Sequence, residues 1–166
     1  MERSLLIIGA GQYGYVARDV AASTGMYETV DFADDQSEAA LYTVQEALKR
    51  GNEYRYAFVA IGSSEARERL TGAFASAGFK IARLISPKAW VSEGAELGEG
   101  CIVEPMAVVN NGAVLGRGTF VCAGAVVNHN AVVGSFCQCD CNCTVAARAS
   151  VPDGIKISCG TFYEGK

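Results

Sequence analysis

The sequence predicts two domains, an α/β domain over residues 1–86 and an all-β parallel β-helix of about four coils over residues 87–166. Two observations predict this fold class. Over the first 85 residues, short apolar runs alternate with amphipathic helical patterns, as in a parallel α/β sheet. From Ala89 to Gly160, a six-residue period repeats without a gap. A period this short is typical of a β-helix, in which each unit is one strand and a turn.

The composition is that of a globular protein and excludes several classes of partner. The chain has 166 residues, half of them hydrophobic, and a formal net charge of −4. No basic cluster is present, so nucleic acids and anionic membrane surfaces are poor partners. No apolar stretch is long enough to span a membrane, and the N-terminus does not have the pattern of a signal peptide. We therefore expect a cytoplasmic protein.

The α/β domain is predicted to contain four strands and three helices. Strands are expected over 5–8, 29–32, 56–61 and 80–85, and helices over 15–23, 37–50 and 65–77. Pro87 marks the junction between the domains, since proline cannot continue a central strand. The hexads begin two residues later.

A glycine-rich loop, Gly9-x-Gly11-x-x-Gly14, follows the first strand and opens the first helix. At this position the free N–H groups and the dipole of the helix favour an anion such as a phosphate. Asp34 and Asp35 end the second strand, where a ribose or base is read in Rossmann-like domains. About four strands make only one half of a dinucleotide fold, which favours a mononucleotide-sized ligand over an oxidoreductase cofactor. The alternative is that the glycines only permit a tight turn and close helix packing.

The hexads predict the interior of the β-helix. When the hexads are counted from Ala89, their first place is nearly always Ala, Cys or Thr, and their third place is aliphatic in all but one unit. These two places are expected to point inward. The third-place residues are Val91, Leu97, Val103, Val109, Leu115, Val121, Val127, Val133, Cys139, Val145, Val151 and Ile157.

The seven cysteines are predicted to be reduced thiols, and most fit the repeat. Cys101, Cys137 and Cys143 occupy first places and Cys139 a third place, where free cysteine behaves as a small hydrophobe. The alternating run from Cys137 to Cys143 leaves open a soft-metal face. However, zinc sites normally combine paired cysteines from two chain segments. We therefore expect no metal.

His129 is the only histidine, and it occupies a fifth place, near a corner of the β-helix. Three hexads make one coil, so residues eighteen apart stack, which puts Asn111 and Ala147 on either side of His129. An exposed imidazole suits general-base catalysis. No cysteine or serine is paired with it, which favours direct transfer over a covalent intermediate. The alternative is a surface histidine without a role.

The chain resembles the hexapeptide-repeat acyltransferases, in particular the sialic acid O-acetyltransferase and UDP-amino-sugar N-acetyltransferase family of the NeuD and PglD type. The resemblance spans nearly the whole chain. It rests on Ile8-Gly9-Ala10-Gly11-x-x-Gly14, Phe32-Ala33-Asp34-Asp35, Ala60-Ile61-Gly62 with Arg67, Leu84-Ile85-Ser86-Pro87-Lys88-Ala89-x-Val91, and the block from Val126 to Phe136.

The resemblance implies a left-handed β-helix that forms a homotrimer and takes acetyl-CoA, without a metal, in the groove between subunits. His129 stands in the place of the family's general base, and the backbone at Ala146 and Ala147 in the place that binds the acetyl carbonyl. The N-terminal domain would hold the nucleotide of a sugar substrate. The residues expected to bind it are Gly11, Gln12, Tyr13, Gly14, Asp34, Asp35, Ile61 and Gly62.

The sequence departs from the family pattern in three places. Asn130 follows the base where the family has an acidic residue, Gln138 replaces a histidine that contacts the cofactor, and the β-helix has fewer coils. The resemblance implies an acetyl-CoA-dependent acetyltransferase that acts directly on an amino or hydroxyl group of a nucleotide-linked sugar. The alternative is a non-catalytic trimeric scaffold that binds a nucleotide sugar and has a degenerate acetyl-CoA site.

Overall fold

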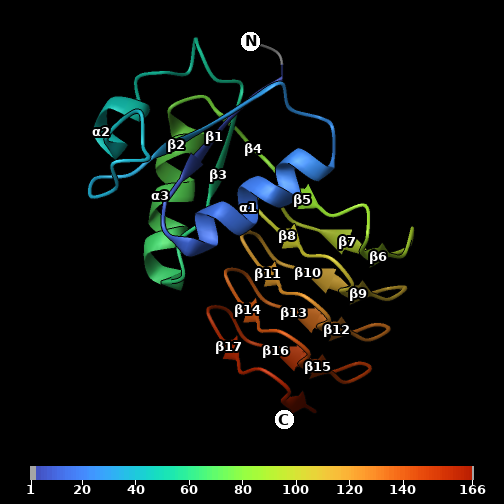
Figure 1. Ribbon diagram of the computed structural model, residues 1–166. Helices are drawn as coiled ribbons and strands as arrows, with labels where there is room; N and C mark the ends of the chain where they lie inside the picture. The colour runs from blue at the N-terminus through green and yellow to red at the C-terminus, as the bar shows by residue number, and fades with distance from the viewer. Residues whose placement is uncertain (1–2, 166) are drawn as a thin grey trace. The chain divides into compact units, whose positions relative to one another are not determined.

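The computed structural model describes residues 3–165, which form two compact units that meet in the chain between Leu84 and Ile85 (Figure 1). The predicted fold class is confirmed. The first unit is a parallel α/β sheet with helices, and the second consists of three parallel sheets of short strands that form a β-helix of about four coils.

The sheet of the first unit has four parallel strands in the order β2-β1-β3-β4. The strands are β1 (Ser4–Ile8), β2 (Thr29–Ala33), β3 (Tyr56–Val59) and β4 (Lys80–Ile81). The chain passes from the central strand β1 to the edge strand β2 and then crosses back to β3, which pairs with the other edge of β1. The carboxyl ends of β1 and β3 therefore form a topological switch point, which is where ligands bind in open α/β sheets.

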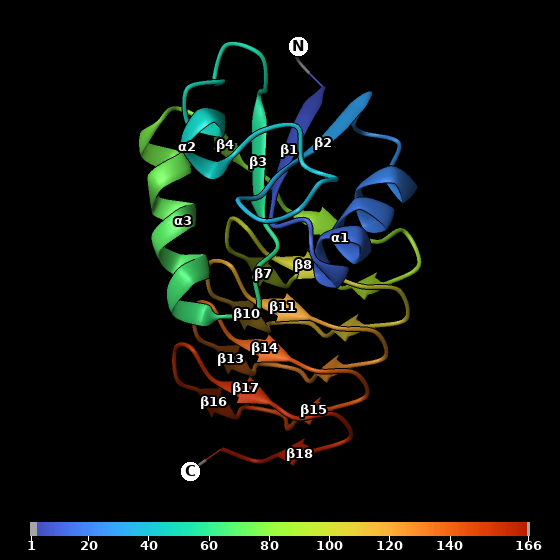
Figure 2. The ribbon, with the colours of Figure 1, turned by 60° about the vertical axis from the view of Figure 1, so that its left-hand side comes forward.

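Two long helices cover the two faces of this sheet, and Figure 2 shows α1 (Gln12–Ser23) and α3 (Ser64–Ser76) on opposite sides of it. Both have one buried stripe at helical spacing. In α1 the stripe is Gly14, Ala17, Val20 and Ala21, and in α3 it is Arg67, Leu70, Thr71 and Phe74. The small residues of α1 allow it to approach the sheet closely.

The helix predicted over 37–50 is wrong for most of its length, since only α2 (Val44–Ala47) is helical. The preceding residues pair with β2 instead. The N–H of Leu41 donates to Phe32 at 3.0 Å, and Tyr42 forms a parallel bridge with Ala33. A capping box between Thr43 and Glu46 then starts the short helix. Backbone pairing with β2 therefore outweighs the helical pattern.

The strand predicted over 80–85 divides between the two units. Its first part is β4, and its last part, β5 (Leu84–Ile85), is an edge strand of a sheet of the β-helix. From there each hexad forms a two-residue strand from its second and third places. These strands are β6 (Trp90–Val91), β7 (Glu96–Leu97), β8 (Ile102–Val103), β9 (Val108–Val109), β10 (Val114–Leu115), β11 (Phe120–Val121), β12 (Val126–Val127), β13 (Val132–Val133), β14 (Gln138–Cys139), β15 (Thr144–Val145), β16 (Ser150–Val151), β17 (Lys156–Ile157) and β18 (Phe162–Tyr163).

Every pairing in the β-helix joins residues eighteen positions apart. Val109, Val127 and Val145, for example, are paired in register in three successive coils. The third-place residues from Val103 to Ile157 are at most 3% exposed and fill one continuous core with the small first-place residues. The predicted interior of the repeat is therefore confirmed.

Buried thiols contribute hydrogen bonds as well as volume. The first-place residues Cys101, Thr119 and Cys137 stack, and each donates to a carbonyl oxygen fifteen residues further along the chain, at 3.1, 2.7 and 3.0 Å. Cysteine and threonine thus have the same role in this column. The predicted core thiols Cys101, Cys137, Cys139 and Cys143 are buried and belong to no disulfide, whereas Cys141 and Cys159 are exposed.

The turns between walls require a left-handed backbone at the sixth place of the hexad. Glycine is the usual residue there, and the non-glycine residues with positive φ are Met106, Asn130, Phe136, Asn142 and Arg148. At Gly118 (φ 63°) a second constraint applies. A Cβ there would overlap the ring of Phe136, which lies one coil further along. Backbone conformation and stacking both select glycine at this position.

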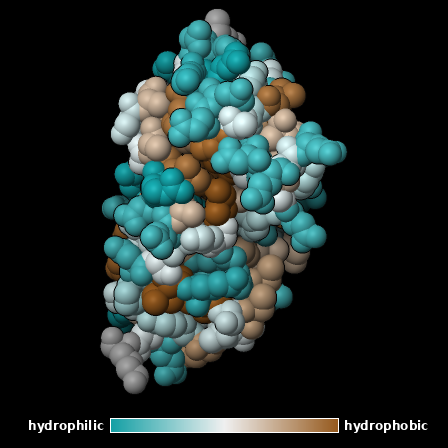
Figure 3. Space-filling model, turned by 90° about the vertical axis from the view of Figure 1, so that its left-hand side faces the viewer, coloured by the Kyte–Doolittle hydropathy of each residue, from teal (hydrophilic) through white to brown (hydrophobic). Residues whose placement is uncertain are grey.

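The surface is largely hydrophilic on the face drawn in Figure 3, where apolar side chains form smaller areas between polar ones. This agrees with apolar cores inside each unit. Among the residues that the structure describes, no helix is long and apolar enough to cross a membrane.

Two glycine substitutions should separate backbone strain from steric overlap. Gly160 has a φ of 66°, close to that of Gly118, but a Cβ added there would meet no atom within 4 Å. We expect Gly160→Ala to cost about 1–2 kcal/mol of the free energy of unfolding through left-handed strain alone. Gly118→Ala should cost a further 1–3 kcal/mol, roughly, because of the overlap with Phe136. Urea unfolding measures both values, and equal losses would contradict the stacking constraint.

Candidate functional site

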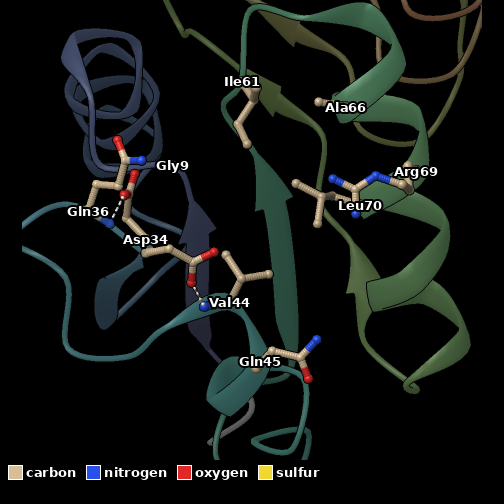
Figure 4. Close-up of a pocket in the computed structure, with 10 residues that line it drawn as sticks. Gly9, Asp34, Gln36, Val44, Gln45, Ile61, Ala66, Arg69 and Leu70 are labelled. Atoms are coloured by element: carbon tan, nitrogen blue, oxygen red, sulfur yellow. Dashed lines mark hydrogen bonds between the residues drawn. The ribbon is translucent and has the colours of Figure 1, made fainter.

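A pocket of about 350 Å³ lies at the carboxyl ends of β1, β2 and β3, at the switch point of the first unit. Figure 4 shows Gly9, Asp34 and Gln36 on one side of it, and Ile61, Leu70 and Arg69 on the side of β3 and α3. The residues that line it are Gly9, Asp34, Asp35, Gln36, Val44, Gln45, Ile61, Ala66, Arg69 and Leu70. Of the predicted binding residues, Asp34, Asp35 and Ile61 meet here.

The glycines of the first loop have different physical roles. Gly9 has a φ of 104°, which favours glycine. A Cβ at Gly14 would clash with the carbonyl oxygen of Gly9, so Gly14 lets α1 pack against the loop. Gly11 is the N-cap of α1, and a Cβ added to it would meet no atom within 4 Å. Only Gly11 leaves open space in front of the helix.

No side chain at the N-terminus of α1 offsets the positive end of the helix dipole. Gly11 provides no side-chain cap, and the first turn contains no acidic residue. The helix dipole therefore keeps its positive end available to an anion. Gly11, Gln12, Tyr13 and Gly14 do not line the pocket described above, although Ala10, the residue before Gly11, donates to Asp34.

Asp34 holds the loop in place. Its Oδ2 accepts a hydrogen bond from the N–H of Ala10 at 2.8 Å, and its Oδ1 accepts one from the N–H of Gln36 at 2.8 Å. These bonds, with that from Ala10 the strongest influence, lower the pKa of Asp34 although partial burial acts in the opposite direction. Both carboxylate oxygens thus bind the backbone, which indicates a structural role beside any contact with a ligand.

Asp35 is more exposed and is only partly engaged. Its Oδ1 accepts a hydrogen bond from the N–H of Val44, the first residue of α2, at 2.9 Å. Within residues 3–165, no hydrogen bond is formed to its Oδ2. Asp35 therefore supports the start of α2 with one oxygen and can present the other to a ligand.

Sequence reasoning missed Arg69, Gln36 and Gln45, which also line the pocket. Arg69 is exposed on α3, two residues after the buried Arg67. The helical spacing of the buried residues of α3 places position 69 next to the buried face of the helix. A run of charged residues on a helix more often indicates a solvated surface, so the sequence alone gives no reason to select Arg69. Arg69 gives the pocket a cation beside its two carboxylates, and Ile61 and Leu70 give it an apolar surface.

Arg67 shapes the loop after β3. Its guanidinium donates to the carbonyl oxygens of Ile61 at 2.7 Å and Gly62 at 3.2 Å. This contact fixes the backbone that places Ile61 in the pocket. Gly62 lies on the same loop, outside the lining residues.

The corner of the β-helix that carries His129 has the predicted stack. The N–H of Asn130 donates to the carbonyl oxygen of Asn111 at 3.1 Å, and the N–H of Arg148 donates to that of His129 at 3.1 Å. These bonds place Asn111, His129 and Ala147 at the same corner of three successive coils. The imidazole is exposed and contributes nothing to the core.

The backbone around His129 is held by asparagine side chains. The Oδ1 of Asn128 accepts from the N–H of His129 at 2.9 Å and from the Nδ2 of Asn110 at 3.3 Å. Asn130, at φ 56°, places its amide Nδ2 3.2 Å from the Nδ1 of the imidazole. The residue that replaces an acidic partner therefore does contact the ring.

Ala147 offers a backbone donor one coil beyond His129. The neighbouring N–H of Ala146 donates to the carbonyl oxygen of Tyr163 at 2.8 Å. None of the backbone hydrogen bonds found within residues 3–165 uses the N–H of Ala147. The corner thus combines a basic side chain with a backbone N–H that has no partner in the described part of the chain.

Gln138 lies on another wall, in β14, and its side chain is already engaged. Its Nε2 donates to the Oδ1 of Asp140 at 2.7 Å, and Asp140 also forms an ion pair with Lys156 at 3.3 Å. The structure does not bring Gln138 to the corner of His129 within one chain. Among residues 3–165, no group of three or more His, Cys, Asp or Glu side chains could hold a metal ion.

The N-terminal unit matches a known domain family. Residues 4–74 match the model of the PglD N-terminal domain. No curated protein sequence matches the chain.

The whole chain is similar to solved acetyltransferases. It is 27% identical to the acetyltransferase domain of PglB from Neisseria gonorrhoeae in complex with acetyl coenzyme A, with a TM-score of 0.87, over 98% of this chain and 93% of that chain. It is 23% identical to a mutant of perosamine N-acetyltransferase from Caulobacter crescentus in complex with CoA and GDP-perosamine, with a TM-score of 0.63, over 97% and 91% of the two chains. WeeI from Acinetobacter baumannii is 15% identical, with a TM-score of 0.73, over 96% and 93%.

The likeness to the last two structures shows the fold alone. The resemblance inferred from the sequence is confirmed by the match to the PglD N-terminal domain and by the likeness to the acetyltransferase domain of PglB.

Replacing Asp34 should reveal its structural role in the pH dependence of stability. The pKa of Asp34 is lower in the folded protein than in the unfolded chain, where it is about 3.9. The ionised carboxylate therefore stabilises the fold at a pH above the unfolded pKa. This stabilisation is lost as the pH falls through the lower pKa of the folded state. We expect Asp34→Asn to cost about 1–3 kcal/mol at pH 7 and progressively less below about pH 4. Urea unfolding across this range measures the effect. Glu38→Gln, at an exposed acidic residue of the same loop, is the control, and identical pH profiles for the two variants would contradict the assignment.

Proposed function

We propose that this chain, a homologue of the hexapeptide-repeat sugar N-acetyltransferases, transfers the acetyl group of acetyl-CoA to an amino or hydroxyl group of a nucleotide-linked sugar. The observation that carries the proposal is the corner at which the exposed His129 stacks beside the N–H of Ala147, which is unpartnered within residues 3–165. The chain covers 93% of the PglB domain, which is in complex with acetyl coenzyme A. That coverage supports cofactor binding by a β-helix of this length.

His129 acts as the general base in this proposal. Its Nε2 takes a proton from the acceptor as the amine or hydroxyl attacks the carbonyl carbon of the thioester. Nε2 can accept only if the proton of the neutral ring is on Nδ1. The amide of Asn130 must then present its oxygen, rather than its nitrogen, to Nδ1, and a half-turn of the carboxamide achieves this.

The N–H of Ala147 stabilises the charge that develops on the acetyl oxygen. Such a donor is worth roughly 3 kcal/mol when it is aimed at the oxyanion. As the tetrahedral intermediate collapses, the thiolate of CoA leaves and receives the proton held by His129. The residues stacked at this corner are asparagine and alanine, so no thiol or hydroxyl competes as a nucleophile, and the transfer is direct.

The pocket of the first unit binds the nucleotide part of the acceptor. Arg69 is placed to neutralise a phosphate, and the free oxygen of Asp35 to accept a hydrogen bond from a ribose or base. Ile61 and Leu70 provide an apolar surface for a ring. The perosamine N-acetyltransferase from C. crescentus in complex with GDP-perosamine supports a nucleotide sugar as the substrate class.

We further propose a cytoplasmic homotrimer with acetyl-CoA between subunits. One wall of the β-helix carries an outward row of Trp90, Val108, Val126, Thr144 and Phe162, of which Trp90 is 65% and Phe162 60% exposed. A cyclic assembly would bury such a row with equivalent contacts. Light scattering that shows a monomer at micromolar concentration would contradict this assembly.

The rival function is a scaffold that binds a nucleotide sugar without catalysis. The contact of Gln138 with Asp140 favours it, because an engaged amide is a poor substitute for a cofactor-binding histidine. Release of free CoA thiol from acetyl-CoA in the presence of an amino-sugar nucleotide distinguishes the enzyme from the scaffold.

Substitutions at the His129 corner test the base. His129→Ala should lower kcat by two or more orders of magnitude and leave the melting temperature nearly unchanged, because the imidazole is exposed. Asn130→Asp should raise kcat severalfold, because a carboxylate accepts from Nδ1–H and stabilises the imidazolium. Thiol release measured with a chromogenic disulfide gives both rates. A His129→Ala variant with near wild-type turnover would overturn the general-base assignment.

Substitution of Asp35 tests the nucleotide pocket. Asp35→Ala should raise the KM for the acceptor about ten- to hundredfold and leave the KM for acetyl-CoA unchanged. It should also cost about 1 kcal/mol of stability, because the N–H of Val44 loses its partner. Thr43→Ala is the matched control, since it weakens the start of α2 without changing a side chain that lines the pocket. Equal acceptor KM values for the two variants would assign Asp35 a structural role only.

A further inference from the structure

Two thiols near the C-terminal end of the β-helix are not used by its core. Cys101, Cys122, Cys137, Cys139 and Cys143 are buried, whereas Cys141 and Cys159 are exposed and free. Neither exposed thiol contributes to the sites described above.

Cys141 and Cys159 occupy the same corner of successive coils. Both are fifth-place residues, eighteen positions apart, and the strands before them, β14 and β17, pair Cys139 with Ile157. The N–H of Gly160 donates to the carbonyl oxygen of Cys141 at 3.0 Å, which joins the two turns directly. Stacked coils are about 4.8 Å apart. This separation lies inside the range of about 4.4–6.8 Å that Cα atoms span in a disulfide.

The electrostatic surroundings of Cys141 also indicate that the two sulfurs lie close together. Burial, followed by the carboxylate of Glu104 and the thiol of Cys159, raises the pKa of Cys141. Asp140 acts in the same direction, and its own charge is paired with Lys156. A raised pKa disfavours the thiolate of Cys141, so this thiol is assigned the second, resolving attack.

We propose that Cys141 and Cys159 form a disulfide between coils by exchange with a small-molecule disulfide such as oxidised glutathione. The thiolate of Cys159 attacks one sulfur of glutathione disulfide, which gives a mixed disulfide and releases one reduced glutathione. The thiolate of Cys141 then attacks the sulfur of Cys159 and releases the second glutathione. The two cysteine protons pass to solvent or to the released thiolates, and the two electrons lost by the protein reduce one glutathione disulfide.

The disulfide would connect the coil of β14 to that of β17 and β18. It closes a loop that contains β15, β16 and β17, so it restricts the unfolded chain and opposes fraying of the terminal coil. The terminal coil also holds the backbone beside Ala147, because the carbonyl oxygen of Tyr163 accepts from the N–H of Ala146. The inference rests on the stacked thiols and is independent of the proposed transferase activity.

Peptide mapping after oxidation tests the assignment. The folded protein is incubated with oxidised glutathione, alkylated, digested with trypsin without reduction, and analysed by mass spectrometry. Cleavage after Arg117, Arg148 and Lys156 leaves Cys159 as the only thiol of its peptide. We expect this peptide to be linked to the one that spans 118–148, and the number of titratable thiols to fall from the seven of the sequence by two. The melting temperature should rise by about 5–10 °C relative to the reduced protein.

Single substitutions provide the controls. Cys141→Ser and Cys159→Ser should each retain one glutathione on the remaining thiol and give no linked peptides, because the resolving partner is gone. The proposal is overturned if wild-type protein retains glutathione at both positions, forms linked chains instead of an internal bridge, or keeps the peptide link in Cys141→Ser.

Discussion

The eighteen-residue register of the β-helix is the constraint on which the second unit depends. Its strands are only two residues long, so none is stable alone, and each is held by in-register partners in the adjacent coil or coils. A slip by one residue would turn third-place residues such as Val127 outward and second-place residues such as Gln138 inward. The same register that buries the core therefore aligns His129 with Ala147, and Cys141 with Cys159.

The two units differ in how far the residues that stabilise the fold are distinct from the residues of the candidate sites. In the β-helix, corner side chains such as His129 are exposed, so they can vary without disturbing the stacked interior. In the α/β unit the separation is less complete. Asp34 fixes the backbone of Ala10 and Gln36, and Asp35 supports α2, while both line the pocket. Substitutions in that pocket change structure and binding together, which is why a control such as Thr43 is needed.

The sequence predicts the periodic unit far better than the pocket. A hexad fixes which residues are buried and which stack, so the neighbours of His129 follow from counting alone. The α/β pocket depends on tertiary pairing that no local pattern contains. Leu41 and Tyr42 extend the pairing of β2 instead of a helix, and this displaces the start of α2 to Val44. Sequence reasoning missed Arg69 for the same reason, since this exposed cation on α3 lines the pocket only because β2 and β3 end nearby.

Position 130, directly after the proposed base His129, has to satisfy both the backbone conformation and the proposed chemistry. The sixth place of the hexad needs a residue that tolerates the left-handed region, and Asn130 has a φ of 56° there. Asparagine and aspartate are among the few non-glycine residues that adopt this conformation readily. In the proposed mechanism, an amide can orient the imidazole through its oxygen, but it carries no charge to stabilise the imidazolium that forms when His129 takes the proton. The backbone therefore permits either side chain at position 130, and under the proposed mechanism the choice between them sets how strongly His129 is held in the tautomer that accepts a proton at Nε2.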